Sequence, residues 1–267
     1  MRRLMLASVV LTSASTFGIP PLGAQSLWTD RRADRILTFD VLKPEFDGPD
    51  DASFTTSVVM ASVRIPVAAK VFFVGELPFS HYGDDFDSDD AVGSPYAGVE
   101  VRSANGRTFG EFGVRLPTAS DNSAALVGFF TDIDQWEAFV ADVLPVSAAV
   151  NYRFKAPTGV VTRFRVGPTL WLDVGDNVSE SELVLSYGYQ LGYERSAVSL
   201  MGGLSGRLVV TESDLDFGER TVQNLGVALT IGAGRVRPNV QLRIPLDEEM
   251  NDVLNAAVGL GLTVALP

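Results

Sequence analysis

Cysteine is absent from the 267-residue sequence, and histidine occurs only once. Without cysteine the chain has no disulfide framework, no thiolate metal site and no cysteine nucleophile. The single histidine, His81, would need a nucleophile within reach and an orienting partner to act as a catalytic base. Ser80 is adjacent to it and should point to the opposite face of a strand. We therefore expect a protein that is not an enzyme and that carries no cofactor.

Positive charge is also scarce in this chain. It has 21 Lys and Arg residues against 33 Asp and Glu residues, which gives a formal net charge of −12. Nucleic acid phosphates need a basic surface, so no nucleic-acid partner is expected. Beyond the N-terminus, the sequence lacks any uncharged apolar run of the roughly 18 residues that a membrane helix requires.

The N-terminus has the plan of a secretory signal peptide. Arg2 and Arg3 precede the apolar stretch "LMLASVVLTSASTFGI", and "PPLGAQ" then supplies small residues around a predicted cleavage after Ala24. We expect residues 1–24 to be removed on export and residues 25–267 to form the mature domain. The alternative is a buried N-terminal helix.

Polar and apolar residues alternate along most of the remaining chain. In 253–266, Leu254 and Val258 alternate with Asn255 and Gly259. A period of two held over this length belongs to strands and not to helices. The pattern predicts strands near 35–42, 54–66, 69–80, 95–102, 107–116, 144–154, 159–172, 183–193, 197–211, 221–231, 235–245 and 253–266.

Short and long connections alternate between these strands. "SANG" after Arg102 and "GAG" after Ile231 are tight, whereas 81–94 and 117–143 are long. Bacterial outer-membrane barrels have short periplasmic turns, longer external loops and an even strand count. The six long connections (43–53, 81–94, 117–143, 173–182, 212–220 and 246–252) also hold 26 of the 33 acidic residues, which predicts an acidic outer rim.

The sequence therefore favours an all-β fold, a closed antiparallel up-and-down transmembrane β-barrel of about 12 strands. Closure leaves no unpaired sheet edge, which lipid could not satisfy. A secreted β-sandwich or a lipocalin-like barrel is the alternative.

In "RVRPNVQLRIP", residues 235–245, we expect Arg237 and Arg243 to face the lumen. A local bulge is expected at Pro238, which has no amide donor.

Charged residues recur on the polar faces of the predicted strands. If Asn105 and Gly106 form a two-residue turn, Glu100 lies opposite Glu111 and needs a neighbouring arginine. Two interpretations of these charges remain open, a network that plugs and stiffens the barrel or a lumen that selects solutes by charge. The candidate lumen-lining residues are Arg64, Lys70, Glu76, Glu100, Arg102, Glu111, Arg115, Arg153, Arg163, Arg165, Arg207, Arg237 and Arg243.

The run "DDFDSDD" in the second long connection resembles the start of a calcium loop. Asp85, Asp87 and Asp89 have the D-x-D-x-D spacing, but the glycine and the glutamate that should follow are missing. The run is either a solvated loop or a weak divalent-ion site. Bridging cations there could tie the rim to lipopolysaccharide.

Residues 124–142 form the one segment that does not alternate. Phe129, Ile133, Trp136 and Val140 recur at helical spacing, which predicts a short helix in the longest loop. Such a helix could fold into the mouth as a gate, or it could lie against the outer rim as an interfacial anchor.

The stretch "EFGVRLPTASDN", Glu111–Asn122, resembles the "K-L-P-T-G-D" strand-end motif of outer-membrane proteins related to the meta-pathway of phenol degradation. Residues 114–118 carry the likeness, while Ala119 and Ser120 depart from the motif. "VGELPF" followed by "YAGVEVR" is similar in layout. The resemblance implies a barrel channel for small, often hydrophobic or aromatic, molecules, and it brings no catalytic residues.

Together these patterns predict a bacterial outer-membrane channel for the passive passage of small solutes. Its partners would be outer-membrane lipid, lipopolysaccharide and a small-molecule solute. The alternative is a structural or surface-interaction barrel with a plugged lumen.

Overall fold

The computed structural model describes residues 28, 33–46, 55–84, 87–175, 181–212 and 216–267. The predicted signal peptide, 1–24, lies outside these residues. Within them the chain forms thirteen strands: β1 (Ile36–Phe46), β2 (Ser57–Ala68), β3 (Val71–Gly83), β4 (Ser88–Val92), β5 (Tyr96–Arg102), β6 (Thr108–Arg115), β7 (Val143–Lys155), β8 (Val160–Asp173), β9 (Glu182–Glu194), β10 (Val198–Val209), β11 (Thr221–Ile231), β12 (Val236–Pro245) and β13 (Leu254–Ala265).

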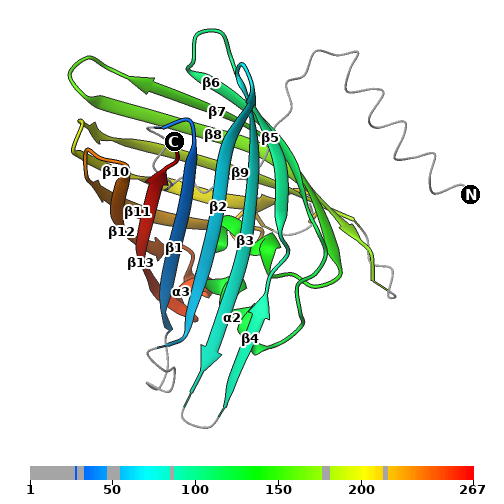
Figure 1. Ribbon diagram of the computed structural model, residues 1–267. Helices are drawn as coiled ribbons and strands as arrows, with labels where there is room; N and C mark the ends of the chain where they lie inside the picture. Colours follow the sequence, from blue (N-terminus) through cyan, green and yellow to red (C-terminus); the bar gives the residue numbers. More distant parts are fainter. Residues whose placement is uncertain (1–27, 29–32, 47–54, 85–86, 176–180, 213–215) are drawn as a thin grey trace, which may run out of the picture.

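Twelve of the thirteen described strands close into a single antiparallel barrel (Figure 1). Consecutive strands of the barrel pair with one another, with β3 pairing to β5 past β4, and the pairing of β1 with β13 completes the ring. The short strand β4 is additional, since it pairs with residues 79–83 of β3 beyond the part that pairs with β5. The predicted closed barrel of about 12 strands is confirmed.

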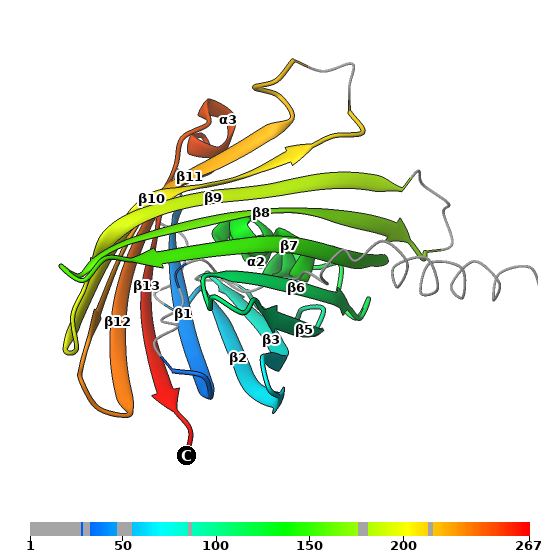
Figure 2. The same ribbon diagram turned by 90° about the horizontal axis from the view of Figure 1, so that it is seen from above.

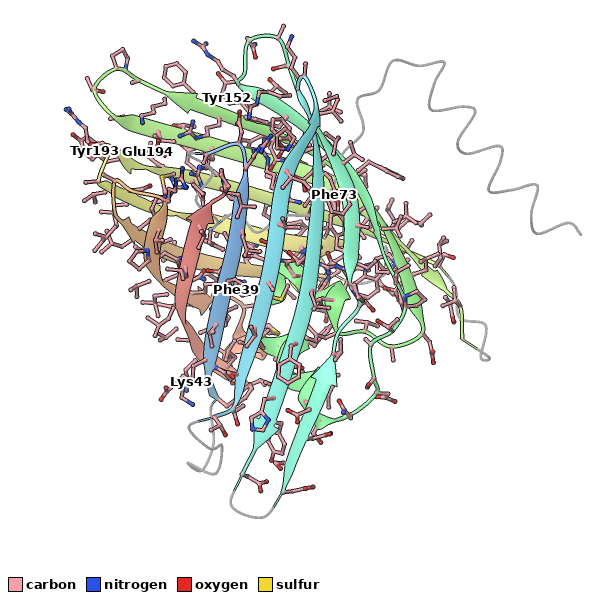
Figure 3. All side chains as sticks on the ribbon, viewed as in Figure 1. Phe39, Lys43, Phe73, Tyr152, Tyr193 and Glu194 are labelled. Atoms are coloured by element: carbon pink, nitrogen blue, oxygen red, sulfur yellow. The ribbon has the colours of Figure 1, made fainter. Side chains whose placement is uncertain are left out.

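The outer face of the barrel is apolar. Phe39, Phe73 and Tyr152 lie on this face (Figure 3). Leu260, at mid-strand in β13, is 63% exposed and lies between Val41 of β1 and Val240 of β12. The opposite face of the same strands holds buried arginines, carboxylates and amides. This inside-out arrangement is that of a barrel surrounded by lipid.

The strand boundaries agree with the sequence pattern to within a few residues, and one local expectation is wrong. Pro238 pairs with Leu262 in unbroken register, so no bulge forms there. Ala265 N donates to Arg235 O, so the backbone N–H and C=O groups of Arg235 face β13. The same is true of every second residue after it along the strand. The backbone of Pro238 therefore faces β11. The hydrogen-bonded pairing of β11 with β12 ends at Asn239, so no hydrogen bond is lost because Pro238 has no N–H.

The predicted helical segment folds into the barrel. It consists of α2 (Ser123–Thr131) and the 3-10 helix η1 (Ile133–Ala138), which meet at Asp132. Figure 2 shows α2 enclosed by the ring of strands. A third helix, α3 (Glu248–Asn251), lies in the loop before β13. In the described part of the chain, no helix combines the length and the apolar character needed to span a membrane.

Candidate functional site: the barrel lumen

The barrel has two different ends, which we call the short-turn end and the loop end. The short-turn end carries the tight connections such as 103–107 and 195–197, and it is uppermost in Figure 1. Twelve of the predicted lumen residues lie on the inner wall between the two ends, buried or half-buried: Arg64, Glu76, Glu100, Arg102, Glu111, Arg115, Arg153, Arg163, Arg165, Arg207, Arg237 and Arg243.

Lys70 does not line the lumen. It sits in the turn between β2 and β3 with a positive φ of 73°, and its side chain is exposed. The prediction extended the polar stripe of β3 one residue too far. The strand begins at Val71, so Lys70 takes the direction set by the turn.

The predicted opposition of Glu100 and Glu111 is confirmed. The two residues are direct cross-strand partners on β5 and β6. Arg64 Nε donates to Glu100 Oε1 at 3.0 Å, and Asn151 Nδ2 donates to Glu111 Oε2 at 3.1 Å. A pair of buried like charges is thus separated by donors that reach each carboxylate from a different strand.

Three wall arginines converge on the segment inside the lumen. Arg243 Nη1 on β12 donates to Asp132 Oδ1 at 2.6 Å. Arg207 on β10 lies 3.0 Å from Glu137 Oε2, and Arg115 on β6 donates to Gln135. These buried charge pairs hold the lumen segment, defined as residues 122–139, away from the external rim.

This arrangement corrects the prediction of a wholly external acidic rim. Asp132 and Glu137 of the third long connection are each 1% exposed, and both lie in the lumen opposite arginines. Alternating patterns do not reveal a loop that turns inward. A signal was present, because the acidic residues 132, 134 and 137 occur among apolar residues at helical spacing.

Close packing supports the ion pairs of the lumen segment. Asn122 caps α2, accepting a hydrogen bond from Ala125 N at 3.0 Å. Phe129 stacks on Trp136 with ring centroids 5.5 Å apart, and Trp136 meets Trp171 of β8 edge-to-face at 5.7 Å. Gly128 lies against the Phe139 ring, where an added Cβ would approach a ring carbon to 2.4 Å, so a larger residue would displace the segment.

Trp28 also reaches the lumen segment. Its Nε1 donates to Asp134 Oδ2 at 2.7 Å, and its ring covers Gly226 of β11. The side chain is 5% exposed. Sequence analysis missed this contact because a single tryptophan upstream of the first strand has no periodic neighbours.

The short-turn end contains a second, separate charge cluster. Glu194 Oε1 lies 2.7 Å from Arg153 and from Lys155, and its second oxygen lies 3.9 Å from Arg163. Figure 3 places Glu194 at this end of the barrel. Glu194 continues the inward stripe of β9 through Gln190, both of them buried. Sequence analysis assigned it to the turn and missed it.

Asp34, just before β1, joins the same end of the lumen. It accepts hydrogen bonds from Arg102, and Arg64 lies 3.9 Å away. The hydrogen bond from Arg102, with the positive charges of Arg102 and Arg64, lowers the pKa of the Asp34 carboxyl against the opposing effect of burial. The Asp34 carboxyl therefore stays ionised at neutral pH.

One cavity lies against the lumen segment itself, and another lies at the short-turn end. At the loop end, a cavity of about 250 Å³ is lined mainly by apolar side chains that include Leu126, Phe129, Phe130 and Phe139. At the short-turn end, a cavity of about 50 Å³ is lined by arginines from β2, β5, β7 and β8. The two cavities share no lining residue, and they differ in chemistry, one mainly apolar and the other rich in arginine.

The proposed calcium run does not assemble a site within the described residues. The Asp87 and Asp89 carboxylates accept hydrogen bonds from the next residue's backbone N–H, and Asp85 lies outside the description. Among the described residues, no group of three potential ligands gathers around a common point.

His81 forms an interaction chain at the loop end. Its Nδ1 lies 2.8 Å from Asp90 Oδ1, and its Nε2 lies 3.2 Å from Thr55 Oγ1. Ser80 points to the opposite, buried face, as expected from strand alternation. The Asp90 side chain is 67% exposed, so water competes for these hydrogen bonds. We interpret the chain as a link between β2, β3 and β4.

Comparison with known proteins identifies the fold. No family model and no curated protein sequence matches the chain. An outer membrane channel from Pseudomonas putida F1 is similar in structure, with a TM-score of 0.59 and 14% identity over 91% of this chain and 100% of that one. The NanC porin aligns with a TM-score of 0.54 and 7% identity, covering 87% of this chain and 100% of its own.

A third similar structure is the translocator domain of the autotransporter NalP from Neisseria meningitidis. Its TM-score is 0.53, with 9% identity over 99% of this chain and 96% of that one. At such low identity these likenesses establish the fold, that of a closed outer-membrane-type β-barrel. They leave cargo and mechanism to be argued from the lumen itself.

Proposed function

We propose that this protein is a bacterial outer-membrane channel for the passive passage of small solutes. The observation that carries the proposal is a closed barrel whose lumen holds a segment attached to the wall by ion pairs between side chains. The segment occupies the lumen at one place, and those ion pairs hold it there. Such pairs can break and re-form without unfolding the wall.

The apolar outer face and the missing sheet edge support a membrane location. In the outer membrane, the short turns would face the periplasm and the acidic loops the exterior. Residues 1–24 would direct export and would be removed. The exposed acidic loops could meet lipopolysaccharide through bridging divalent cations.

The loop-end cavity supports solutes with an apolar body. Leu126, Phe129, Phe130 and Phe139 supply most of its lining, and Leu126 is 57% exposed. The likeness of residues 114–118 to the meta-pathway proteins agrees with small hydrophobic or aromatic cargo. Arg115 in this stretch also contacts the lumen segment, through Gln135.

A second candidate function is a structural barrel whose lumen stays permanently filled. The observation in its favour is the close packing of Phe129, Trp136 and Trp171 together with the buried ion pairs. Such a barrel would act through its loops, and binding to a surface partner would weaken when the aspartates of the run Asp84–Asp90 are replaced by Asn.

Planar bilayer recording separates the two candidates. The purified full chain should give discrete conductance steps, and Arg163→Gln or Arg165→Gln should change their size, because both side chains line the inner wall. Membrane fractionation and heat-modifiable gel mobility should first establish a folded barrel. A folded barrel without conductance, and without solute uptake in liposomes, would favour the structural candidate.

A further inference from the structure

The small cavity at the short-turn end combines positive charge with an apolar wall. Its volume is about 50 Å³, and it is lined by four arginines (Arg64, Arg102, Arg153 and Arg163) together with Asn151, Phe109, Tyr152 and Phe164. These residues come from five different strands, so the barrel closure itself brings them together. The cavity is distinct from the lumen segment and from its ion pairs.

The cavity offers hydrogen-bond donors. A guanidinium has five N–H groups in a planar fork and no acceptor. Arg64, Arg102, Arg153 and Arg163 bring four such forks to the cavity lining. An anion that accepts from guanidinium N–H groups forms charge-assisted hydrogen bonds, which are stronger than those between neutral groups.

The charge balance around the cavity also favours an anion. Arg153, Lys155 and Arg163 converge on the single carboxylate of Glu194. Across the cavity, Arg64 and Arg102 interact with Glu100 and Asp34. With Glu111, which accepts a hydrogen bond from the lining residue Asn151, five cations meet four carboxylates, so the surroundings of the cavity carry one net positive charge.

We propose that this cavity binds a small organic anion through a single carboxylate. The inference rests on the proposed channel function and names the substrate class of that channel. A carboxylate is planar and accepts two parallel hydrogen bonds from one guanidinium fork. The cavity has room for roughly four water molecules, which matches a short-chain carboxylate.

Phe109 sets the preference for a carboxylate over an inorganic oxyanion. Its ring lies on the cavity wall, with Arg102 5.5 Å from the ring centroid. A carboxylate can direct its apolar substituent toward the ring and its oxygens toward the arginines. Sulfate or phosphate would bury an oxygen against carbon with no donor in place.

The test is thermal unfolding of the detergent-purified full chain, followed by heat-modifiable gel mobility. Sodium acetate and sodium propionate should raise the midpoint relative to sodium chloride at equal ionic strength, because a ligand that binds only the folded state stabilises it. Arg153→Gln should weaken the apparent affinity about tenfold, the effect of losing one charge-assisted hydrogen bond. Glu194 keeps Lys155 in that variant, so folding is preserved.

Arg195→Gln is the matched control. It removes the same charge from the same end of the barrel, but Arg195 is exposed in the turn and stacks on Tyr193, outside the cavity lining. This variant should retain the response of the parent chain. An equal loss in both variants, or stabilisation by sulfate and phosphate without stabilisation by acetate, would overturn the proposal.

Carboxylate binding and ion conductance are measured independently, so each proposal can fail without the other. If carboxylates stabilise the protein but no conductance is found, the binding site stands and the channel proposal fails. If conductance is present but carboxylates neither stabilise the protein nor alter the current, the channel stands and the carboxylate site is wrong.

Discussion

Arg243 on the barrel wall donates a 2.6 Å hydrogen bond to Asp132, the residue at which α2 ends and η1 begins. Asp132 is 1% exposed and Arg243 3% exposed, so the pair is closed to solvent. Arg207 makes the equivalent contact with Glu137 from β10, two strands earlier in the barrel. These pairs decide whether the lumen segment stays in place.

Loss of both wall arginines should open the lumen. In an Arg207→Gln, Arg243→Gln variant, Asp132 would stay buried without its nearest cation and Glu137 would keep only Arg115, 3.9 Å away. Breaking a buried pair costs about 3–5 kcal/mol. The segment would relieve this cost by leaving the lumen. Single-channel recording should show a conducting fraction at least roughly tenfold higher than that of the parent chain.

The control for this prediction is Arg220→Gln, just before β11 at the loop end. Arg220 forms no ion pair with the lumen segment among the described residues, so the variant removes a charge and leaves the segment's contacts in place. It should leave the conducting fraction unchanged. If the double variant conducts no more than Arg220→Gln does, the segment does not limit passage.

A second prediction concerns the opposed carboxylates of β5 and β6. Arg64→Met should lower the thermal midpoint of the barrel, because Glu100 would lose its buried cation beside Glu111, at a cost of about 3–5 kcal/mol. Adding Glu100→Gln should recover most of the loss, since the neutral side chain removes the repulsion. The measurement is heat-modifiable mobility of the single and double variants.

Additive effects in that pair of variants would show that Arg64 stabilises the wall by packing alone. Arg64 lies 3.7 Å from the centroid of the Phe72 ring, so a packing contribution exists in either case. The non-additive part isolates the charge interaction.

The wall of this barrel was predictable from sequence because side chains on a strand point alternately to the lumen and to the outside, so polar and apolar residues alternate. Arg163 and Arg165 alternate with Phe164 and Val166, and the structure separates them onto two faces. The same alternation, with one tight turn, gave the Glu100–Glu111 pairing. The prediction for Lys70 was wrong because this residue lies in a turn, where side chains do not alternate between two faces.

The contents of the lumen could not be predicted in the same way. The position of Asp132 depends on Arg243, 111 residues later, and on the enclosed space that only a closed ring of strands creates. The helical spacing around Trp136 indicated a helix but not the side of the rim on which it lies. Trp28 and Glu194 depend equally on contacts between distant parts of the chain.

A final prediction tests the membrane environment of the wall. Leu260 lies at mid-strand with Val41 and Val240 beside it, all three exposed on the outer face. In lipid, Leu260→Arg should destabilise the folded barrel by about 2–4 kcal/mol, because the charge would lie near the bilayer midplane. Unfolding in lipid vesicles, measured against denaturant concentration, gives this value.

Val198→Arg provides the depth control, because Val198 begins β10 at the short-turn end and is also exposed. A charge at that level can reach the interface, so its cost should be only about 0–1 kcal/mol. A barrel bathed in water would tolerate both substitutions equally, since each side chain would already be solvated. The difference between the two variants therefore measures depth in lipid, and equal tolerance would remove the basis for an outer-membrane location.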